Sequence, residues 1–190
     1  MPRRVDILSR AEVFRKLIFR IEEITFRYET YAGDMSADTT RLNLDRGDSV
    51  AAVVHETNQN ALIFTEQFRV STYDKGPGWL LELPAGILEA GEAPDRAMRR
   101  ELEEEIGYRV ASLQHISTFY LSPGGISERI FLFYARVSAT QRVSVGGGLA
   151  AEGEDIRVVT LPVQEALHRM QSGRIADAKT IIGLQWLKLQ

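Results

Sequence analysis

The chain has 190 residues, of which 44% are hydrophobic and 26% charged, and its formal net charge is −3. This length suits one folded domain with a hydrophobic core, and the small negative charge argues against a general nucleic-acid binder. The lack of cysteine excludes disulfides, thiolate metal ligands and thiol nucleophiles.

Targeting and membrane signals are weak along the chain. No apolar run approaches the ~20 residues that span a bilayer, and no apolar segment typical of a signal peptide follows the charged start of the chain. We therefore expect a cytoplasmic protein with no membrane partner. The three histidines, His55, His115 and His168, are far apart and do not predict a zinc site.

The first half of the chain predicts mostly strands. Alternating apolar and polar residues, or runs of β-branched and aromatic residues, favour strands at 17–28, 41–45, 49–55, 61–68 and 79–83. The strands at 49–55 and 61–68 flank the polar stretch 57–60, which predicts a hairpin.

The second half alternates helices with strands. We expect helices at 94–106, 162–171 and 177–189, and strands at 113–120, 129–137 and 156–161. Pro94 suits a first helical position and Gly107 stands where a helix ends. Residues 143–155 hold a triple glycine followed by acidic residues, which predicts a mobile acidic loop. This order of elements predicts an α+β fold with a mixed sheet and helices packed on its faces.

Three glutamates share one face of the predicted helix 94–106. At about 100° per residue, Glu101, Glu104 and Glu105 fall within an arc of about 100°. A neighbouring apolar stripe consists of Met98, Leu102 and Ile106. Glu101 and Glu105 are like charges four residues apart, which costs a helix roughly 0.2–0.5 kcal/mol, and Glu101 has no basic residue three or four positions away. Such unpaired carboxylates favour a divalent cation, Mg²⁺ or Mn²⁺ rather than zinc; a solvated charged face is the alternative.

The same segment carries a longer motif. Residues 86–108 read Gly-x5-Glu-x7-Arg-Glu-Leu-x-Glu-Glu-x-Gly-Tyr. This pattern resembles the signature of the Nudix hydrolases, which cleave nucleoside diphosphates linked to another moiety. Tyr108 is the one departure, because the family usually has an aliphatic residue at this packing position. The resemblance implies one domain over residues 1–190, a Nudix-type α/β/α sandwich with a mixed sheet. Its N-terminal antiparallel strands, at 1–45, would serve dimerisation and 46–190 would form the catalytic core.

The resemblance also implies roles for the residues of the motif. Glu101 and Glu105 would be the main metal ligands, the carbonyl of Ala85 another, and Glu104 a supporting group. Arg100 would orient the carboxylates, and Glu92 would stabilise the loop and helix. The expected metal is Mg²⁺, with Mn²⁺ as the alternative.

Further stretches are similar to the ADP-ribose pyrophosphatases over about residues 40–188. They are Pro123 within the turn 121–125, and the segments 122–129, 148–158 and 181–187. This resemblance makes Glu152 the general base and Glu154 a metal contact; an ordinary acidic surface loop is the alternative. The implied substrate-binding residues are Arg69 for phosphate, Arg41 and Arg46 near the nucleotide, and Glu128 near the terminal ribose. A homodimer is implied, in which a second subunit completes the site.

The substrate choice stays open between two related groups. The GDP-mannose pyrophosphatases share the Ser-Pro-Gly-Gly turn and the triple glycine, and the segments 67–70 and 177–180 favour them slightly. ADP-ribose, cleaved to AMP and ribose 5-phosphate, is the first choice, and GDP-mannose or another nucleoside diphosphate sugar is the alternative. A sensor that binds a nucleotide sugar without cleaving it is an alternative of another class, but it has no need for the complete set of glutamates.

Overall fold

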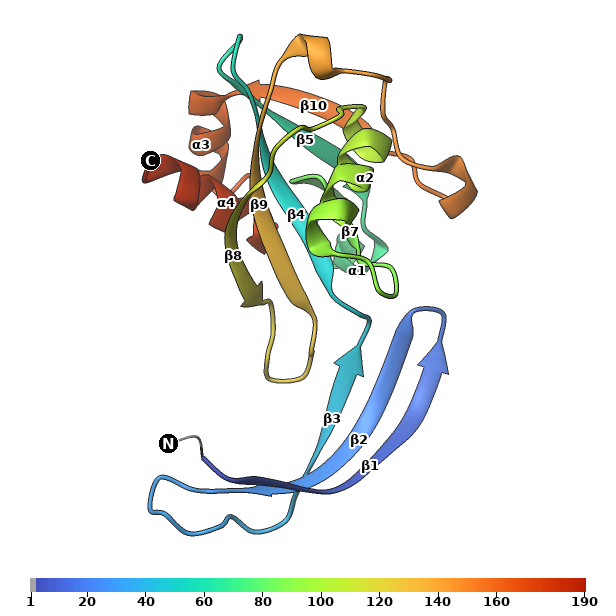
Figure 1. Ribbon diagram of the computed structural model, residues 1–190, viewed down its shortest axis with the longest axis vertical. Coiled ribbons are helices and arrows are strands. Elements are labelled where there is room, and N and C mark those ends of the chain that lie inside the picture. Colours follow the sequence, from blue (N-terminus) through green and yellow to red (C-terminus); the bar gives the residue numbers. More distant parts are fainter. Residues whose placement is uncertain (1–2) are drawn as a thin grey trace. The chain divides into compact units, whose positions relative to one another are not determined.

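A computed structural model describes residues 3–190, except the side chain of Glu152. The chain divides into two compact units (Figure 1). One unit holds the chain up to Asp48 together with Tyr120–Arg129, and the other holds Ser49–Phe119 and Ile130–Gln190.

The first unit is built on a three-stranded antiparallel sheet in the order β1-β2-β3. Its strands are β1 (Val5–Lys16), β2 (Phe19–Tyr28) and β3 (Thr39–Asp45). The predicted N-terminal antiparallel strands are therefore confirmed, but β1 itself was missing from the predicted elements. Nearly all of its side chains are exposed, so the alternation that marks a half-buried strand is absent.

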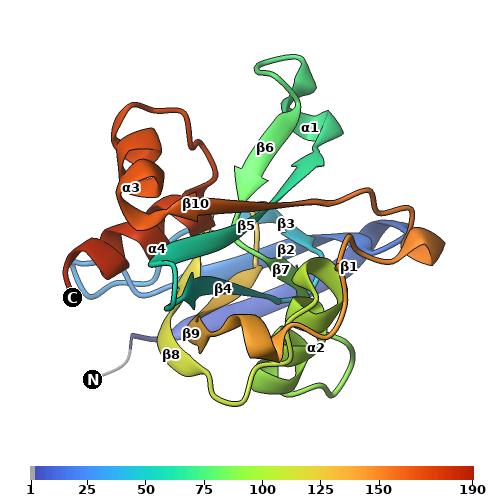
Figure 2. The same ribbon diagram turned by 90° about the horizontal axis from the view of Figure 1, so that it is seen from above.

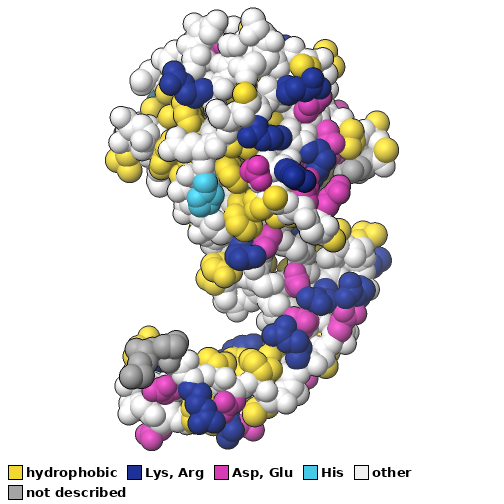
Figure 3. Space-filling view, viewed as in Figure 1, with side chains coloured by type: hydrophobic (Ala, Val, Ile, Leu, Met, Phe, Trp, Pro, Cys, Tyr) yellow, Lys and Arg dark blue, Asp and Glu magenta, His cyan; other side chains and the backbone are white. Residues whose placement is uncertain are grey.

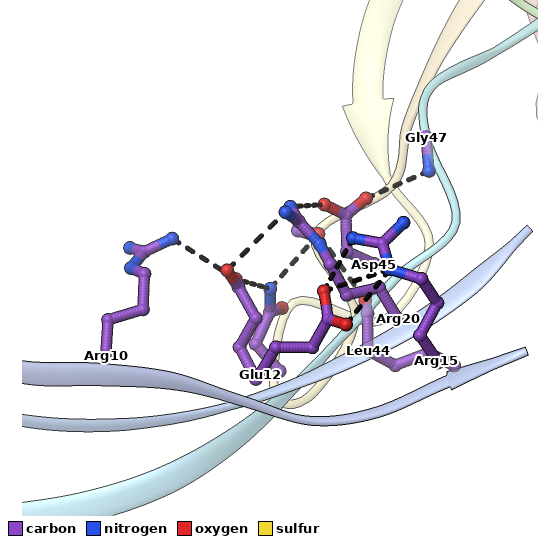
Figure 4. A network of polar contacts seen from close by, with 10 residues as sticks. Arg10, Glu12, Arg15, Arg20, Leu44, Asp45 and Gly47 are labelled. Carbon is purple, nitrogen blue, oxygen red and sulfur yellow. Dashed lines mark hydrogen bonds and ion pairs between the residues drawn. The ribbon is translucent and has the colours of Figure 1, made fainter.

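Charged side chains form ion pairs along this sheet. Strand pairing places Glu12 opposite Glu22 and Arg15 opposite Arg20, and like charges in these positions are destabilising. Each charge instead has a partner of opposite sign (Figure 4): Glu12 binds Arg15 at 2.5 Å, Glu22 binds Arg10 at 3.2 Å, and Arg20 binds Asp45 on β3. The hydrogen bond from the Gly47 backbone and the ion pair with Arg20 lower the pKa of Asp45. The Arg20–Asp45 pair thus connects β2 with β3, whereas the Glu12–Arg15 pair lies within β1.

The second unit contains a seven-stranded mixed sheet. The strands along its main path are β10 (Arg157–Pro162), β5 (Ala61–Phe68), β4 (Ser49–Glu56), β9 (Arg129–Val137) and β8 (Gln114–Tyr120). Two short strands join it, β6 (Trp79–Glu82) on β5 and β7 (Ala85–Ile87) on β4. β4 and β5 form the predicted hairpin, and β4 runs parallel to β9.

Helices cover both faces of this sheet (Figures 1 and 2). They are α2 (Pro94–Ile106), α3 (Val163–Gln171) and α4 (Ala178–Lys188), with a short α1 (Val70–Tyr73) and 3-10 helices at Ala139–Gln141 and Ala150–Glu152. Side chains of β4 alternate between two cores because a strand has a period of two residues. Val50 and Ala52 pack with the side chains of α2, whereas Ala51 and Val53 pack with those of α3 and α4. The predicted α/β/α sandwich is confirmed. Within residues 3–190, none of the helices has the length and apolarity needed to cross a membrane.

Candidate active site

Helix α2 carries the glutamates and is well defined at both ends. Pro94 occupies its first turn, and Gly107 ends it in the left-handed conformation at φ 77°. The buried residues of α2 are Ala97, Met98, Glu101, Leu102, Glu105 and Ile106. The apolar members join the core against β4, and the helix therefore holds two carboxylates, those of Glu101 and Glu105, at the edge of a packed layer.

Glu105 is the most deeply buried of these carboxylates, with 2% of its surface exposed. Burial raises the pKa of Glu105 well above its usual value; the backbone N–H of Ala85 opposes this by donating to Oε2 at 2.9 Å. The nearby charges of Glu101 and Glu154 raise this pKa further, and Arg69 lowers it slightly. These effects place Glu101, Glu105, Glu154 and Arg69 in one electrostatic neighbourhood.

Glu101 fills the space that Gly86 leaves open on β7. A Cβ atom at residue 86 would lie 1.9 Å from Cδ of Glu101. Burial raises the pKa of Glu101, whereas the positive charge of Arg100 opposes that shift. The absence of a side chain at Gly86 therefore lets the carboxylate of Glu101 lie against the strand.

Arg100 holds several carboxylates at once. Its Nη1 donates to Glu101 at 2.7 Å and to Glu104 at 3.1 Å, and its Nη2 donates to Glu92 at 3.1 Å. Glu92 also accepts the backbone N–H of Glu89 at 3.2 Å, which ties the loop before α2 to the helix. The expectation that Glu101 is unpaired is therefore wrong. The prediction takes account only of partners three or four residues away on the helix, but the long side chain of Arg100 reaches Glu101, its direct neighbour in the sequence.

The acidic loop is joined to the C-terminal end of α2 by its glycines. The backbone N–H groups of Gly147 and Gly148 donate to the carbonyls of Glu105 and Glu104 at 2.9 and 3.1 Å. Both glycines have positive φ, and a Cβ on Gly148 would lie 2.5 Å from Oε2 of Glu154. That oxygen accepts the backbone N–H of Leu149 at 2.9 Å.

The proposed base falls partly outside the described part of the chain. The backbone of Glu152 belongs to the 3-10 helix Ala150–Glu152, but its side chain lies outside the described residues.

A pocket of about 660 Å³ lies next to this loop. Its lining consists of Gln67, Phe68, Arg69, Trp79, Gly153, Glu154 and Asp155. Arg69 and the acidic loop thus line the same pocket, although they are far apart in the sequence. The cavity has room for a small organic molecule of the size that protein pockets usually bind.

Glu82 and Lys179 are neighbours of this pocket that the sequence analysis did not identify. Arg69 Nε donates to Glu82 Oε2 at 2.7 Å, and Lys179 Nζ approaches Glu82 Oε1 at 3.4 Å. Glu82 is 4% exposed. A glutamate at the end of the apolar stretch Trp79–Leu81 was the one available signal, because a buried charge requires a partner.

The other predicted substrate-binding residues belong to the first unit. Glu128 is buried, and its Oε2 lies 3.9 Å from Nη1 of Arg46. Arg41 is exposed and donates to the carbonyl of Thr40 at 2.8 Å. The structure thus pairs two residues predicted for opposite ends of the substrate, Arg46 and Glu128, with each other.

The donor set suits a hard divalent cation in its chemistry. Two desolvated carboxylates with raised pKa values, on Glu101 and Glu105, would be stabilised as anions by such an ion. Within residues 3–190, leaving out the side chain of Glu152, no three acidic or histidine side chains are already gathered closely enough to hold an ion. Glu101 and Glu104 are instead turned to Arg100, and Glu154 to the backbone of its own loop.

Comparisons with known proteins agree with the family resemblance of the sequence. The family model described as a NUDIX domain matches residues 45–181. The chain is 36% identical over 190 residues to the ADP-ribose pyrophosphatase of Haemophilus influenzae, covering 97% of this chain and 86% of that protein. It is 34% identical over 186 residues to the ADP-ribose pyrophosphatase of Escherichia coli K12, with coverage of 97% and 88%. It is 36% identical over 180 residues to the GDP-mannose pyrophosphatase of Yersinia pestis, with coverage of 94% and 89%.

Proposed function

The chain belongs to the NUDIX domain family of hydrolases that act on pyrophosphate bonds, and from this premise we propose that it cleaves a nucleoside diphosphate sugar. ADP-ribose is the first choice, with AMP and ribose 5-phosphate as products. The observation that carries the proposal is the buried pair Glu101 and Glu105 next to the pocket that contains Arg69. GDP-mannose is the second candidate, because a pyrophosphatase of that name is as similar in sequence as those named for ADP-ribose.

The family uses divalent metal ions, and we propose Mg²⁺ here, with Mn²⁺ as an alternative. The carboxylates of Glu101, Glu105 and Glu154 with the carbonyl of Ala85 would hold it, because Mg²⁺ prefers oxygen ligands. When bound, the metal supplies electrostatic stabilisation of phosphoryl charge and lowers the pKa of water.

The protein groups have separate tasks in this proposal. Arg100 keeps the Glu101 and Glu104 carboxylates on one side of α2 through bonds of 2.7 and 3.1 Å. Arg69 binds the diphosphate, since a guanidinium fork matches phosphate oxygens. Glu152 takes the proton of the attacking water, and its place on a loop would let it act only when the site is filled.

We further propose a homodimer formed through the sheet β1–β3. Figure 3 shows apolar side chains between the charged ones along this sheet. The exposed apolar residues of its strands and first turn include Val5, Ile7, Val13, Phe14, Leu17 and Leu42. Exposed apolar surface of this kind favours burial against another protein. Arg41, Arg46 and Glu128 are further proposed substrate-binding residues of this dimer. A cytoplasmic location stays a prediction from the sequence.

Phosphate release tests the proposed reaction. The protein is incubated with a panel of substrates, once with Mg²⁺ and once with EDTA: ADP-ribose, GDP-mannose, ADP-glucose, NADH and diadenosine polyphosphates. A phosphatase then releases phosphate from the products, and this phosphate is measured. One strongly preferred sugar nucleotide, cleaved with Mg²⁺ and left intact in EDTA, is the expected result. A folded protein that binds Mg²⁺ and cleaves none of these compounds would overturn the proposal and favour the non-catalytic sensor.

A further inference from the structure

Within the second unit, a chain of charged contacts runs from the pocket to the start of α4. Arg69 Nε donates to Glu82 at 2.7 Å, and Lys179 lies 3.4 Å from the other oxygen of Glu82. Lys179 also binds Asp177 at 2.7 Å, and Asp177 caps helix α4 by accepting the backbone N–H of Thr180 at 2.9 Å. The contacts connect the end of β5, β6 and the start of α4.

Three of these groups are buried, and Arg69, which lines the pocket, is the most exposed. The side chains of Glu82 and Asp177 are 5% and 10% exposed, that of Lys179 is 14% exposed, and that of Arg69 is 39% exposed. A buried carboxylate with two cationic partners is held firmly, because losing either partner would leave charge without compensation. Glu82 is therefore held in place, and Arg69 is the exposed end of this chain of contacts.

The terminal nitrogens of the Arg69 guanidinium are available to bind a ligand. Glu82 engages Nε, and the two terminal nitrogens make no hydrogen bond to any other residue in the described part of the chain. Arg69 lines the pocket together with Glu154 of the acidic loop. An arginine held at Nε still has the end of its guanidinium, where Nη1 and Nη2 each direct one N–H in parallel, and this edge suits an oxyanion with several acceptor oxygens.

We propose that Glu82 is a positioning residue that aims Arg69 at the diphosphate of the substrate, and that Lys179 fixes Glu82 in turn. This inference rests on the proposed function, because it assigns Arg69 to the phosphate groups. Holding the guanidinium in its binding orientation before the substrate arrives lowers the entropic cost of binding. The effect falls on substrate affinity, because Arg69 contacts the diphosphate before and during the reaction.

Replacement of Glu82 tests the proposal in steady-state kinetics with ADP-ribose. Glu82→Met keeps a side chain of similar length and removes both acceptor oxygens. We expect KM to rise about tenfold, as for the loss of one charge-assisted hydrogen bond, and kcat to change little. Lys179→Met should raise KM less, since its contact with Glu82 is longer. Glu82→Gln, which keeps one acceptor oxygen, should lie between wild type and Glu82→Met. The melting temperature of each variant shows that it is folded.

A double-mutant cycle separates positioning from a general structural role. If Glu82 acts through Arg69, then Glu82→Met adds nothing to the KM of Arg69→Ala. The matched control is Glu66→Gln on β5, which removes an ion pair of 2.6 Å with the exposed Arg157 outside the pocket lining; its KM should equal that of wild type. An unchanged KM for Glu82→Met, or the same rise in the Arg69→Ala background, would overturn the inference.

Binding of inorganic pyrophosphate, measured by calorimetry with Mg²⁺, keeps this test independent of turnover. If wild type cleaves no substrate but binds pyrophosphate, and Glu82→Met weakens that binding only when Arg69 is present, the positioning role stands and the proposed reaction fails. If wild type does not bind pyrophosphate, or Glu82→Met leaves its affinity unchanged, the positioning role is refuted.

Discussion

Gly86 lies where any larger residue would displace the carboxylate of Glu101. A Cβ atom at residue 86 would be 1.9 Å from Cδ and from Oε1 of Glu101, and 2.4 Å from Oε2. Carbon atoms prefer separations of about 3.5 Å, so in Gly86→Ala the carboxylate would move by about 1.6 Å. The backbone of Gly86 is outside the left-handed region, so alanine introduces no strain there.

The consequences for activity and stability differ. Misplacing a catalytic group by about 1 Å can lower the rate about 100-fold, and we expect a loss of kcat of at least that size. The stability change stays small, because alanine gains roughly 0.5–1 kcal/mol over glycine in a strand while a partly exposed ion pair of Glu101 with Arg100 loses up to about 1 kcal/mol. The melting temperature should therefore move by no more than about 2–4 °C.

Phosphate release from ADP-ribose under saturating substrate measures this effect, and thermal unfolding measures stability. Gly76→Ala is the control, because a Cβ there meets only Thr72 O at 3.5 Å, an ordinary contact. A Gly86→Ala enzyme with wild-type kcat and wild-type melting temperature would refute the idea that the position of Glu101 matters for the reaction. A large drop in melting temperature would instead refute the small stability cost.

Three further predictions concern the buried carboxylates and the packing of α4. Glu105→Gln should lower kcat at least about 100-fold and remove the Mg²⁺-dependent rise in melting temperature, whereas Glu103→Gln, whose exposed side chain pairs with Arg109, should leave both unchanged. In EDTA, the free energy of unfolding should fall as the pH rises above 4.5, the usual pKa of glutamate, toward the raised pKa values of Glu101 and Glu105. In this range the two carboxyl groups keep their protons in the folded protein and lose them in the unfolded chain. Denaturant titrations in which stability rises with pH above 4.5 would contradict this. Gly183→Ala should destabilise the protein by about 1 kcal/mol in urea unfolding, because a Cβ atom at residue 183 would lie 2.6 Å from Val53 and 2.9 Å from Leu83. Overpacking of this kind costs about 1–3 kcal/mol, and the higher helix propensity of alanine returns about 1 kcal/mol. An unchanged urea midpoint would show that α4 shifts without cost to accept the methyl group.

The elements predicted well are those whose pattern is local. The helix at residues 94–106 and the strand at 129–137 have the predicted bounds, and the hairpin differs by a single residue at the end of β4. Each has either a capping residue or a continuous apolar pattern that a packed layer requires. The strand Val5–Lys16 has neither, and the short elements Val70–Tyr73 and Ala85–Ile87 are too brief to show a period.

The site divides in the same way between local and distant information. The sequence alone determined the family motif and the shared face of Glu101, Glu104 and Glu105, because residues one turn apart on a helix must lie together. Only the tertiary structure decided that Glu82 lies between Arg69 and Lys179, which is 97 residues further along the chain. Contacts of that kind depend on how β6 and α4 pack, and a charge pattern in the sequence does not identify which partner the fold brings near.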